Sequence, residues 1–149
     1  MDTLKVKKLH PAAHPPEKAK PGDLGYDLFA LEHVEIPHGQ MKPVKTGIAV
    51  EFPEGWGGII KDRSSMALKR ITVSAGVIDH GYRGEIVILL TNSSGEDVTI
   101  LQDQKIAQLI PCPVTNWKVE ITGQLNDTHR GEGGFGSTGA FKNPVLTLE

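Results

Sequence analysis

One aspartate of this chain stands where a carboxylate could move a proton. Apolar residues precede Asp79, and a turn flanked by Gly81 and Gly84 presents Tyr82 before the next apolar run. A hairpin of this kind leaves backbone donors and acceptors at its open end, and Asp79 is expected beside that opening as a candidate for acid–base work. The alternative is an ordinary β-turn in which the Asp79 carboxylate bonds its own backbone.

A second segment, Lys61–Ala67, combines positive charge with hydroxyl groups. Arg63 is followed by Ser64 and Ser65 where a strand gives way to residues that favour a helical turn. Such a junction can present a guanidinium, hydroxyls and helix N-terminal N–H groups to an anion. The alternative is a helix N-cap beside a surface arginine.

A third segment is rich in glycine and contains a literal G-x-G-x-x-G from Gly131 to Gly136. A dinucleotide fingerprint follows a strand and opens a helix within a complete βαβ unit. Too few residues remain here for that unit, and nothing downstream looks helical. No Gly-Lys-Ser/Thr follows either, so the segment is not a Walker A loop.

The same segment still suits the binding of phosphates. Flexible glycines bring backbone N–H groups close to phosphate oxygens. Arg130 adds charge, Ser137 and Thr138 add hydroxyls, and Phe135 offers an aromatic face to a base. The alternative is a disordered glycine-rich tail.

The elements that must position these segments are predicted to be short strands. Turn residues separate runs that are rich in apolar or β-branched side chains. The predicted strands are Val44–Phe52, Trp56–Lys61, Glu85–Thr91, Lys105–Ile110 and Trp117–Ile121, with turns at Pro53–Gly55, Asn92–Gly95 and Pro111–Pro113. One helical turn is expected at Ser64–Lys69. The pattern predicts an all-β sandwich or barrel.

Patterning weakens near both ends of the chain. The proline-rich stretch His10–Gly22 is expected to be an extended surface segment. From Gln124 onward the apolar periodicity fades, which predicts a mobile C-terminal arm and tail over residues 124–149. The 149 residues suit one domain, so a single domain spanning 1–149 is predicted.

Composition excludes several classes of protein. A net charge of -2 argues against stable binding to nucleic acid or to an anionic membrane. The one cysteine, Cys112, permits no intramolecular disulfide, and no apolar run approaches the length of a secretory or membrane-spanning segment. We expect a soluble intracellular domain, and specifically a cytoplasmic one.

Five motifs, in order along the chain, together resemble a known family. They are Gly22–Leu28 (GDLGYDL), Asp62–Ala67 (DRSSMA), Gly76–Gly84 (GVIDHGYRG), Lys105–Leu109 (KIAQL) and Arg130–Gly139 (RGEGGFGSTG). Each is weak evidence alone. In this order and with this spacing, they are similar to those of the trimeric dUTP pyrophosphatase (dUTPase) family, across nearly the whole length of the chain.

Two motifs depart from the usual family pattern. Asp62 stands where many members have glycine, and Asp103, Gln104 and Lys105 replace the Gly-Asp-Arg that commonly opens the fourth motif. Aspartate tolerates a left-handed turn better than most residues, so the backbone at Asp103 is expected to be kept. Lys105 keeps the charge but loses the bidentate fork of arginine.

The resemblance implies a fold, an assembly and a reaction. It implies a jelly-roll-like β fold and a homotrimer with shared active sites, whose glycine-rich arm crosses to a neighbouring subunit. The implied enzyme is a dUTP diphosphatase, which converts dUTP and water to dUMP and pyrophosphate, keeps uracil out of DNA and supplies dUMP for thymidylate synthesis.

The resemblance also implies roles for individual residues. Asp79 would be the base that activates water, and Asp27 would hold a Mg2+ ion through water. Tyr82 would pack against the deoxyribose, the Gly76–Glu85 backbone would pair with the uracil edge, and Phe135 would stack on the base. The residues assigned to substrate are Arg63, Ser64, Ser65, Gly76, Val77, Ile78, Tyr82, Gln108, Arg130, Phe135, Gly136, Ser137 and Thr138.

Two other functions remain open from the residues alone. A dCTP deaminase shares the fold but carries a catalytic glutamate shortly after the corresponding turn, and the stretch Ile86–Leu90 has no carboxylate. A module that binds dUTP without cleaving it would need the same pocket but no base. The presence of Asp79 beside Tyr82 favours chemistry.

Overall fold

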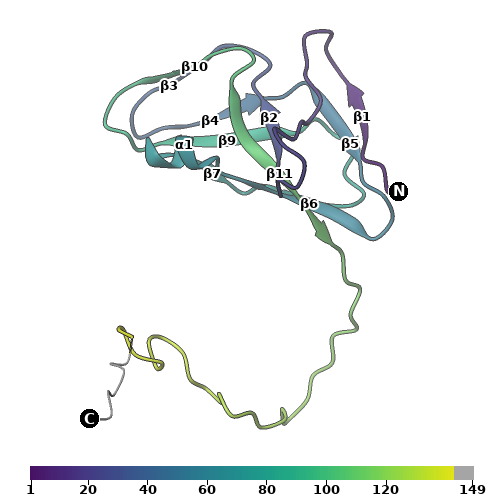
Figure 1. The fold of residues 1–149 in the computed structure, drawn as a ribbon, viewed down its shortest axis with the longest axis vertical. Coiled ribbons are helices and arrows are strands. Elements are labelled where there is room, and N and C mark those ends of the chain that lie inside the picture. The colour runs from purple at the N-terminus through teal and green to yellow at the C-terminus, as the bar shows by residue number, and fades with distance from the viewer. Residues whose placement is uncertain (143–149) are drawn as a thin grey trace, which may run out of the picture. The chain divides into compact units, whose positions relative to one another are not determined.

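A computed structural model describes residues 1–142 of the chain. The chain separates into two units, Met1–Asn116 and Trp117–Glu149. The first unit contains the strands and one helix (Figure 1). These elements are β1 (Lys5–Lys8), β2 (Tyr26–Phe29), β3 (Val34–Ile36), β4 (Met41–Lys45), β5 (Ile48–Glu51), β6 (Trp56–Lys61), α1 (Ser64–Leu68), β7 (Ile71–Ser74), β8 (Val77–Ile78), β9 (Val87–Asn92), β10 (Val98–Ile100) and β11 (Lys105–Pro113).

Every pairing between these strands is antiparallel. A four-stranded sheet has the order β2-β11-β6-β8, and a three-stranded sheet has the order β4-β9-β7. Two further pairs, β1-β5 and β10-β3, complete the first unit. The non-consecutive strand orders mean that the chain crosses repeatedly between sheets, as in a jelly-roll-like β fold. The predicted fold class is confirmed.

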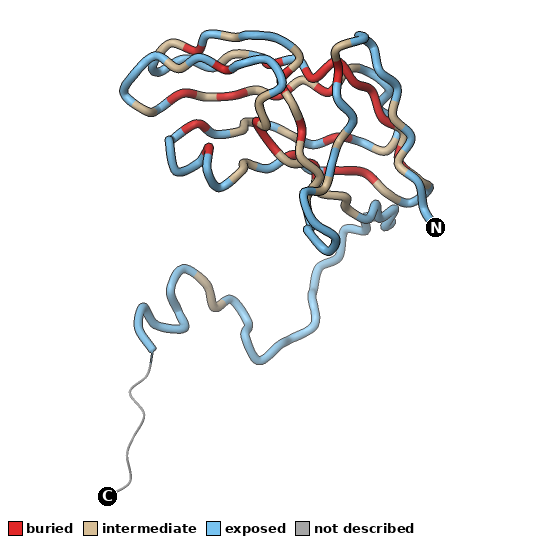
Figure 2. Tube along the Cα trace, turned by 45° about the horizontal axis from the view of Figure 1, so that its top comes forward, coloured by how far each residue is buried: buried red, intermediate tan, exposed pale blue. Residues whose placement is uncertain are grey.

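The core lies between the sheets and is almost entirely aliphatic. Figure 2 shows the buried positions as red stretches that recur along the strands of the first unit. In β9 burial alternates, with Ile88 and Leu90 buried and their neighbours half-buried, which is the period of a strand with one face in the core. Thr46 and Asn92 are the buried polar residues of the described chain; the Thr46 hydroxyl donates to the Ile86 carbonyl, and the Asn92 side-chain amide donates to the carbonyls of Ile36 and Glu96.

Several predicted elements are confirmed, and one is divided. The strand Trp56–Lys61 is β6, and the helical turn predicted at Ser64–Lys69 is α1. The strand predicted over Val44–Phe52 is two strands, β4 and β5, separated at Thr46 and Gly47. Gly47 has a φ of 72°, which breaks the extended conformation and turns the chain.

The turn predicted at Pro111–Pro113 is wrong, because these residues continue β11. Pairing of β11 with β2 ends at Leu109 opposite Tyr26, while pairing with β6 continues to Pro113 opposite Trp56. The last residues of β11 therefore have one open edge. Proline is tolerated in a strand where its missing N–H faces such an edge.

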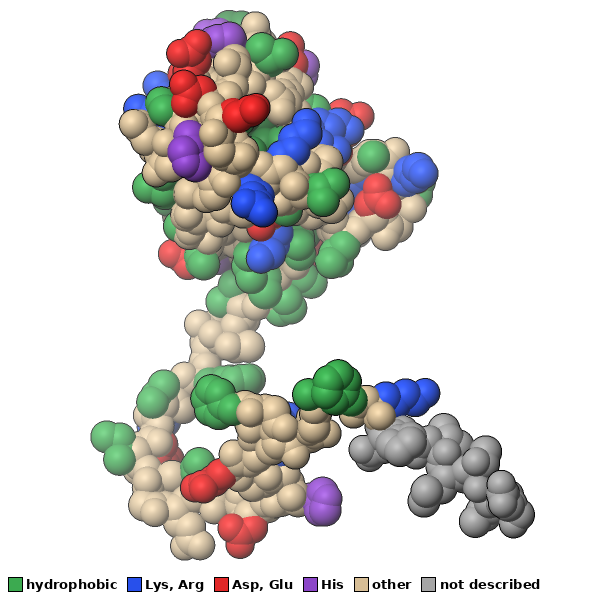
Figure 3. Space-filling view, turned by 90° about the vertical axis from the view of Figure 1, so that its left-hand side faces the viewer, with side chains coloured by type: hydrophobic (Ala, Val, Ile, Leu, Met, Phe, Trp, Pro, Cys, Tyr) green, Lys and Arg blue, Asp and Glu red, His purple; other side chains and the backbone are tan. Residues whose placement is uncertain are grey.

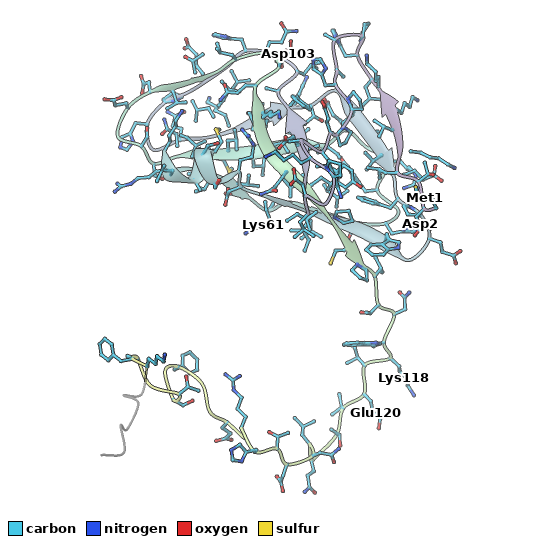
Figure 4. All side chains as sticks on the ribbon, in the orientation of Figure 1. Met1, Asp2, Lys61, Asp103, Lys118 and Glu120 are labelled. Atoms are coloured by element: carbon cyan, nitrogen blue, oxygen red, sulfur yellow. The ribbon has the colours of Figure 1, made fainter. Side chains whose placement is uncertain are left out.

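The strand predicted at Trp117–Ile121 is also wrong for the isolated chain. Residues 117–121 form no strand and are exposed, and hydrophobic side chains are visible along the second unit in Figure 3. Figure 4 labels the intervening charged residues Lys118 and Glu120, whose side chains extend away from the backbone. The alternation that suggests a strand is real, but a strand also needs a partner for its backbone groups.

Candidate active site

The Asp79 hairpin borders a pocket of about 250 Å³ on the first unit. The hairpin begins in β7, passes through a sharp turn into β8 and continues through a second turn toward β9. The pocket is lined by Ser74, Ala75, Gly76, Val77, Ile78, Asp79, Tyr82, Glu85, Val87 and Leu89. The structure thus brings together five of the predicted site residues: Gly76, Val77, Ile78, Asp79 and Tyr82.

The first turn of the hairpin depends on glycine. Gly76 has a φ of 93° and follows Ala75, whose φ is 57°. The Gly76 carbonyl accepts a hydrogen bond from the Ile60 N–H at 2.7 Å, and an added Cβ would lie 2.7 Å from the Ile60 carbonyl oxygen. No side chain fits in that space without moving the backbone. Gly76 therefore fixes the pocket wall against β6.

The second turn presents Asp79 and Tyr82. The Tyr82 N–H donates to the Asp79 carbonyl at 3.1 Å, and the Tyr82 hydroxyl donates to the Glu85 carbonyl at 2.8 Å. The guanidinium of Arg83 donates to the carbonyls of His80 and Tyr82. These bonds give the aromatic ring a fixed place in the pocket wall.

The Asp79 carboxylate is exposed, and within residues 1–142 it makes no hydrogen bond or ion pair. The ordinary turn in which this side chain bonds its own backbone is therefore not what forms. A carboxylate without a protein partner at the mouth of a pocket can accept a proton from water.

The Arg63 segment forms the junction between β6 and α1. Arg63 is the N-cap of α1, with φ -77° and ψ 140°, and no side chain caps the helix. Its carbonyl accepts from the N–H groups of Met66 and Ala67, and the buried Met66 side chain anchors the helix to the core. Ser64 and Ser65 are exposed beside it. The hydroxyls and the guanidinium of this segment are thus displayed together.

Asp27 joins this segment to β11 through two ion pairs. Its Oδ1 lies 3.4 Å from Nε of Arg63, and its Oδ2 lies 3.0 Å from Nζ of Lys105. The Asp27 side chain is 16% exposed, so solvent screens these pairs less than pairs on an open surface. Lys105 thus places a point charge beside Asp27. The φ of 66° at Asp103 confirms the predicted left-handed turn before β11, where Figure 4 labels this residue.

Gln108 lies at the centre of this cluster. It stands opposite Asp27 of β2 and Lys61 of β6, and its Nε2 donates to the Asp62 carbonyl at 2.8 Å. Gly25 makes room for this side chain, since a Cβ there would lie 2.2 Å from Gln108 Oε1. The predicted phosphate-gripping residues Arg63, Ser64, Ser65 and Gln108 therefore gather around one end of β6 and β11.

The glycine-rich segment belongs to the second unit and forms consecutive turns of its own. Arg130 Nε donates to the Gly133 carbonyl at 2.9 Å, and the Ser137 N–H donates to the Gly134 carbonyl at 3.0 Å. Phe135 has a φ of 50° and is fully exposed, and Gly136 has a φ of 87°. Thr138 is exposed as well. The aromatic ring and the hydroxyls of this segment are open to a ligand.

The side chains of two residues near these sites were not assigned a role from the sequence. Glu85 lines the pocket, accepts the Tyr82 hydroxyl through its carbonyl, and accepts the Gly47 N–H at 2.9 Å through its carboxylate. Asp62 supplies the carbonyl that holds Gln108. Both lie inside or directly beside the recognisable motifs, but their contacts depend on partners far away in the sequence.

The described residues contain no ready-made metal cage. Within residues 1–142, no group of three or more His, Cys, Asp or Glu side chains could hold a metal ion. Asp27, the predicted outer ligand, has each carboxylate oxygen beside a cation of the chain. This donor set fits a divalent ion only if the ligand itself brings most of the coordinating oxygens.

No helix within the described part of the chain is both long enough and apolar enough to cross a membrane.

Comparison with known proteins gives one consistent family. Residues 12–139 match the family model described as dUTPase. Deoxyuridine 5'-triphosphate nucleotidohydrolases of Clostridioides difficile and Clostridium acetobutylicum are 45% and 46% identical to this chain. The alignments cover 93% of this chain and 99% of the first relative, and 95% of this chain and 100% of the second.

Solved structures give the same family. The dUTPase of Staphylococcus bacteriophage 80alpha with dUpNHpp matches with a TM-score of 0.83 at 30% identity, covering 92% of this chain and 98% of that one. A mutant dUTPase of phage phi11 of S. aureus, described with a coordinated structural Mg(II) ion, matches with a TM-score of 0.76 at 27% identity, covering 84% and 99%. With the family model matched over most of its length, the chain belongs to the dUTPase family, the hydrolases that convert dUTP to dUMP and pyrophosphate.

Proposed function

We propose that this chain hydrolyses dUTP with Asp79 as the general base. An oxygen lone pair of water attacks the α-phosphorus, and one water proton passes to the Asp79 carboxylate. The bond from the α-phosphorus to the bridging oxygen breaks, and its electron pair leaves with pyrophosphate. The observation that supports this role is an exposed carboxylate, without a protein partner in the described chain, at the rim of the 250 Å³ pocket.

The phosphate chain is proposed to bind at the cluster around Arg63. The guanidinium, the hydroxyls of Ser64 and Ser65 and the amide of Gln108 are donors, and charge-assisted bonds to phosphate oxygens are among the stronger ones. Arg130, Gly136, Ser137 and Thr138 would close over the γ end. Bonds that strengthen as charge develops on leaving pyrophosphate lower the barrier as well as hold the substrate.

Uracil and deoxyribose are proposed to occupy the hairpin pocket. Backbone groups of Gly76, Val77 and Ile78 would pair with the uracil edge, where cytosine presents the opposite donor and acceptor pattern. Tyr82, held by the Glu85 carbonyl, would pack where a ribose 2′-hydroxyl must go. Phe135 would stack on the base. A nucleotide that leaves such groups unpaired is expected to have a kcat/KM about 10⁴–10⁵-fold lower than that of dUTP.

Mg2+ is the cofactor of dUTPases, and we propose that the triphosphate oxygens supply most of its ligands here. Mg2+ keeps several waters and takes few protein ligands in nucleotide sites. Asp27 is the proposed outer partner of those waters, and its two ion pairs keep its charge beside Arg63 and Lys105. The ion would neutralise charge on the phosphates. The phage phi11 relative described with a structural Mg(II) ion is compatible with this proposal.

A homotrimer with shared active sites is the proposed assembly. Trp117, Val119 and Ile121 are 84%, 91% and 99% exposed and alternate with charged Lys118 and Glu120. An extended segment with one apolar face pairs readily with an open sheet edge of another chain. This alternation supports strand exchange between subunits. A cytoplasmic location is proposed from the sequence alone.

Two rival functions are less well supported. Val87 and Leu89 are the residues of β9 that line the pocket, and both are apolar, so this strand offers no carboxylate for deamination of dCTP. A silent dUTP-binding module has no need of an unpartnered carboxylate at the pocket rim.

Pyrophosphate release from a panel of nucleoside triphosphates, with and without Mg2+, tests the proposal. Preferred cleavage of dUTP over dCTP, dTTP and UTP, lost on chelation of Mg2+, is the expected result. Ammonia from dCTP would instead support the deaminase. Tight binding of dUTP without any product would support the silent module.

A further inference from the structure

The Asp62 side chain makes a specific contact beside the Arg63 cluster. The Asp62 Oδ1 accepts a hydrogen bond from the Val73 backbone N–H, in a partly buried position. Asp62 lies directly after β6, next to Lys61 labelled in Figure 4, and Val73 lies in β7. The contact therefore joins the residue that follows β6 to a strand of the other sheet.

The Val73 N–H needs such a partner. β7 is the edge strand of its sheet, with the order β4-β9-β7. The N–H groups on the outer side of an edge strand have no ladder partner. A glycine at position 62 would leave the Val73 N–H without this acceptor, and an unpaired, partly buried donor is unfavourable.

The backbone of Asp62 is tied to the phosphate cluster. Its carbonyl accepts from Gln108 Nε2 at 2.8 Å, so the side chain and the carbonyl hold the residue at two points. The next residue is Arg63, whose extended backbone sends the guanidinium toward Asp27. Loss of the side-chain contact would free this junction to rotate and would release Gln108 with it.

We propose that Asp62 is a positioning residue for phosphate binding. The Asp62–Val73 bond fixes the β6–α1 junction and thereby sets the positions of Gln108 and Arg63. This inference rests on the proposed role of those two residues in holding the phosphates.

Binding of the non-hydrolysable analogue dUpNHpp to the full-length protein, measured by calorimetry with Mg2+, tests the role. Asp62→Ala is expected to weaken binding about tenfold, a step of about 1.4 kcal/mol, and to raise KM more than it lowers kcat. Asp62→Asn keeps an oxygen acceptor and is expected to restore binding. Asp62→Gly serves as the second truncation if the alanine variant does not fold.

Two comparisons separate positioning from a general loss of stability. Asp97→Ala removes another aspartate that accepts a backbone N–H, from His38 at 3.0 Å in a different loop, and is expected to leave dUpNHpp affinity unchanged. In a Gln108→Ala background, Asp62→Ala is expected to have a smaller effect than in the wild type, because the two residues act through one contact.

The outcomes distinguish this inference from the function on which it rests. The positioning role alone would be overturned if both Asp62→Ala and Asp62→Gly bound dUpNHpp with wild-type affinity. It would also be overturned if the losses of affinity caused by Asp62→Ala and Gln108→Ala were fully additive in the double variant. Absence of dUpNHpp binding by the wild-type protein would overturn the proposed function first, and the positioning role with it.

Discussion

At the scale of single residues, the site depends on which polar groups have partners. The Arg63, Lys105 and Gln108 side chains are each held by contacts with Asp27 or with the Asp62 carbonyl. The Asp79 carboxylate has no such contact within residues 1–142. The groups proposed to bind phosphate are thus pre-oriented, while the carboxylate proposed to take a proton is left accessible.

Asp79→Asn tests the proposed base. The amide keeps the size and polarity of the side chain but cannot accept the water proton, so kcat should fall by about 10²–10⁴-fold. Affinity for dUpNHpp should remain close to that of the wild type. Steady-state kinetics and calorimetry measure the two quantities separately, and undiminished turnover would remove Asp79 from the mechanism.

The sequence predicted which residues belong to the candidate site better than it predicted the contacts that these residues make. The five motifs contain the pocket residues Gly76–Asp79 and Tyr82 and the Arg63 cluster, which the structure places in two groups on the first unit. The roles of Asp62 and Glu85 needed the structure, because their partners Val73 and Gly47 are 11 and 38 residues away. Sequence spacing carries no information about such pairs until the sheet register is known.

At the scale of elements, the pocket is shaped by the turn between β7 and β8. Local patterns predicted β6 and α1 correctly because their residues suit those elements. They failed at Thr46–Gly47, where one positive φ divides an apolar run, and at Pro111–Pro113, where an open edge tolerates proline. The second of these failures, like the unpaired segment Trp117–Ile121, concerns strand pairing, which a local pattern does not contain.

Gly76→Ala tests the close packing of that turn against β6. A left-handed φ costs an alanine about 1–2 kcal/mol, and the Cβ contact with the Ile60 carbonyl adds to it. Gly95→Ala is the matched control, because Gly95 has a φ of 94° but open space around its Cβ position. The midpoint of thermal unfolding should fall further for Gly76→Ala than for Gly95→Ala, and only the former should raise KM for dUTP. Equal effects of the two variants would argue against close packing at Gly76.

Phe135→Ala tests the stacking role of the glycine-rich arm. Stacking of a base on an aromatic side chain contributes about 1–3 kcal/mol, so the variant should lose about 5- to 150-fold in kcat/KM. Phe141→Ala is the control, because Phe141 is also exposed in the second unit but lies outside the motif. Size-exclusion chromatography should show unchanged assembly for both variants. Full activity of Phe135→Ala would count against stacking.

At the scale of the whole molecule, the second unit is proposed to complete the site only in the assembled enzyme. A chain shortened to residues 1–129 would lose Arg130, Phe135 and the hydroxyls of Ser137 and Thr138 but keep every strand of the first unit. We expect its circular dichroism to remain that of a folded β protein and its turnover of dUTP to fall by far more than its stability. Normal cleavage of dUTP by this shortened chain would contradict the closing role of the arm.

The exposed apolar residues at the start of the second unit lead to a prediction about assembly. Val119→Asp places a charge on the face formed by Trp117, Val119 and Ile121, whereas Glu120→Gln changes the opposite face. If that apolar face pairs with a neighbouring subunit, burying an unpaired carboxylate there is strongly unfavourable. Light scattering after gel filtration should then show a trimer for the wild type and for Glu120→Gln, but smaller species for Val119→Asp. Since the active sites are proposed to be shared, dUTP hydrolysis should fall as the trimer is lost and should recover at protein concentrations that restore the trimer. A fully active monomer would contradict the proposal that the active sites are shared.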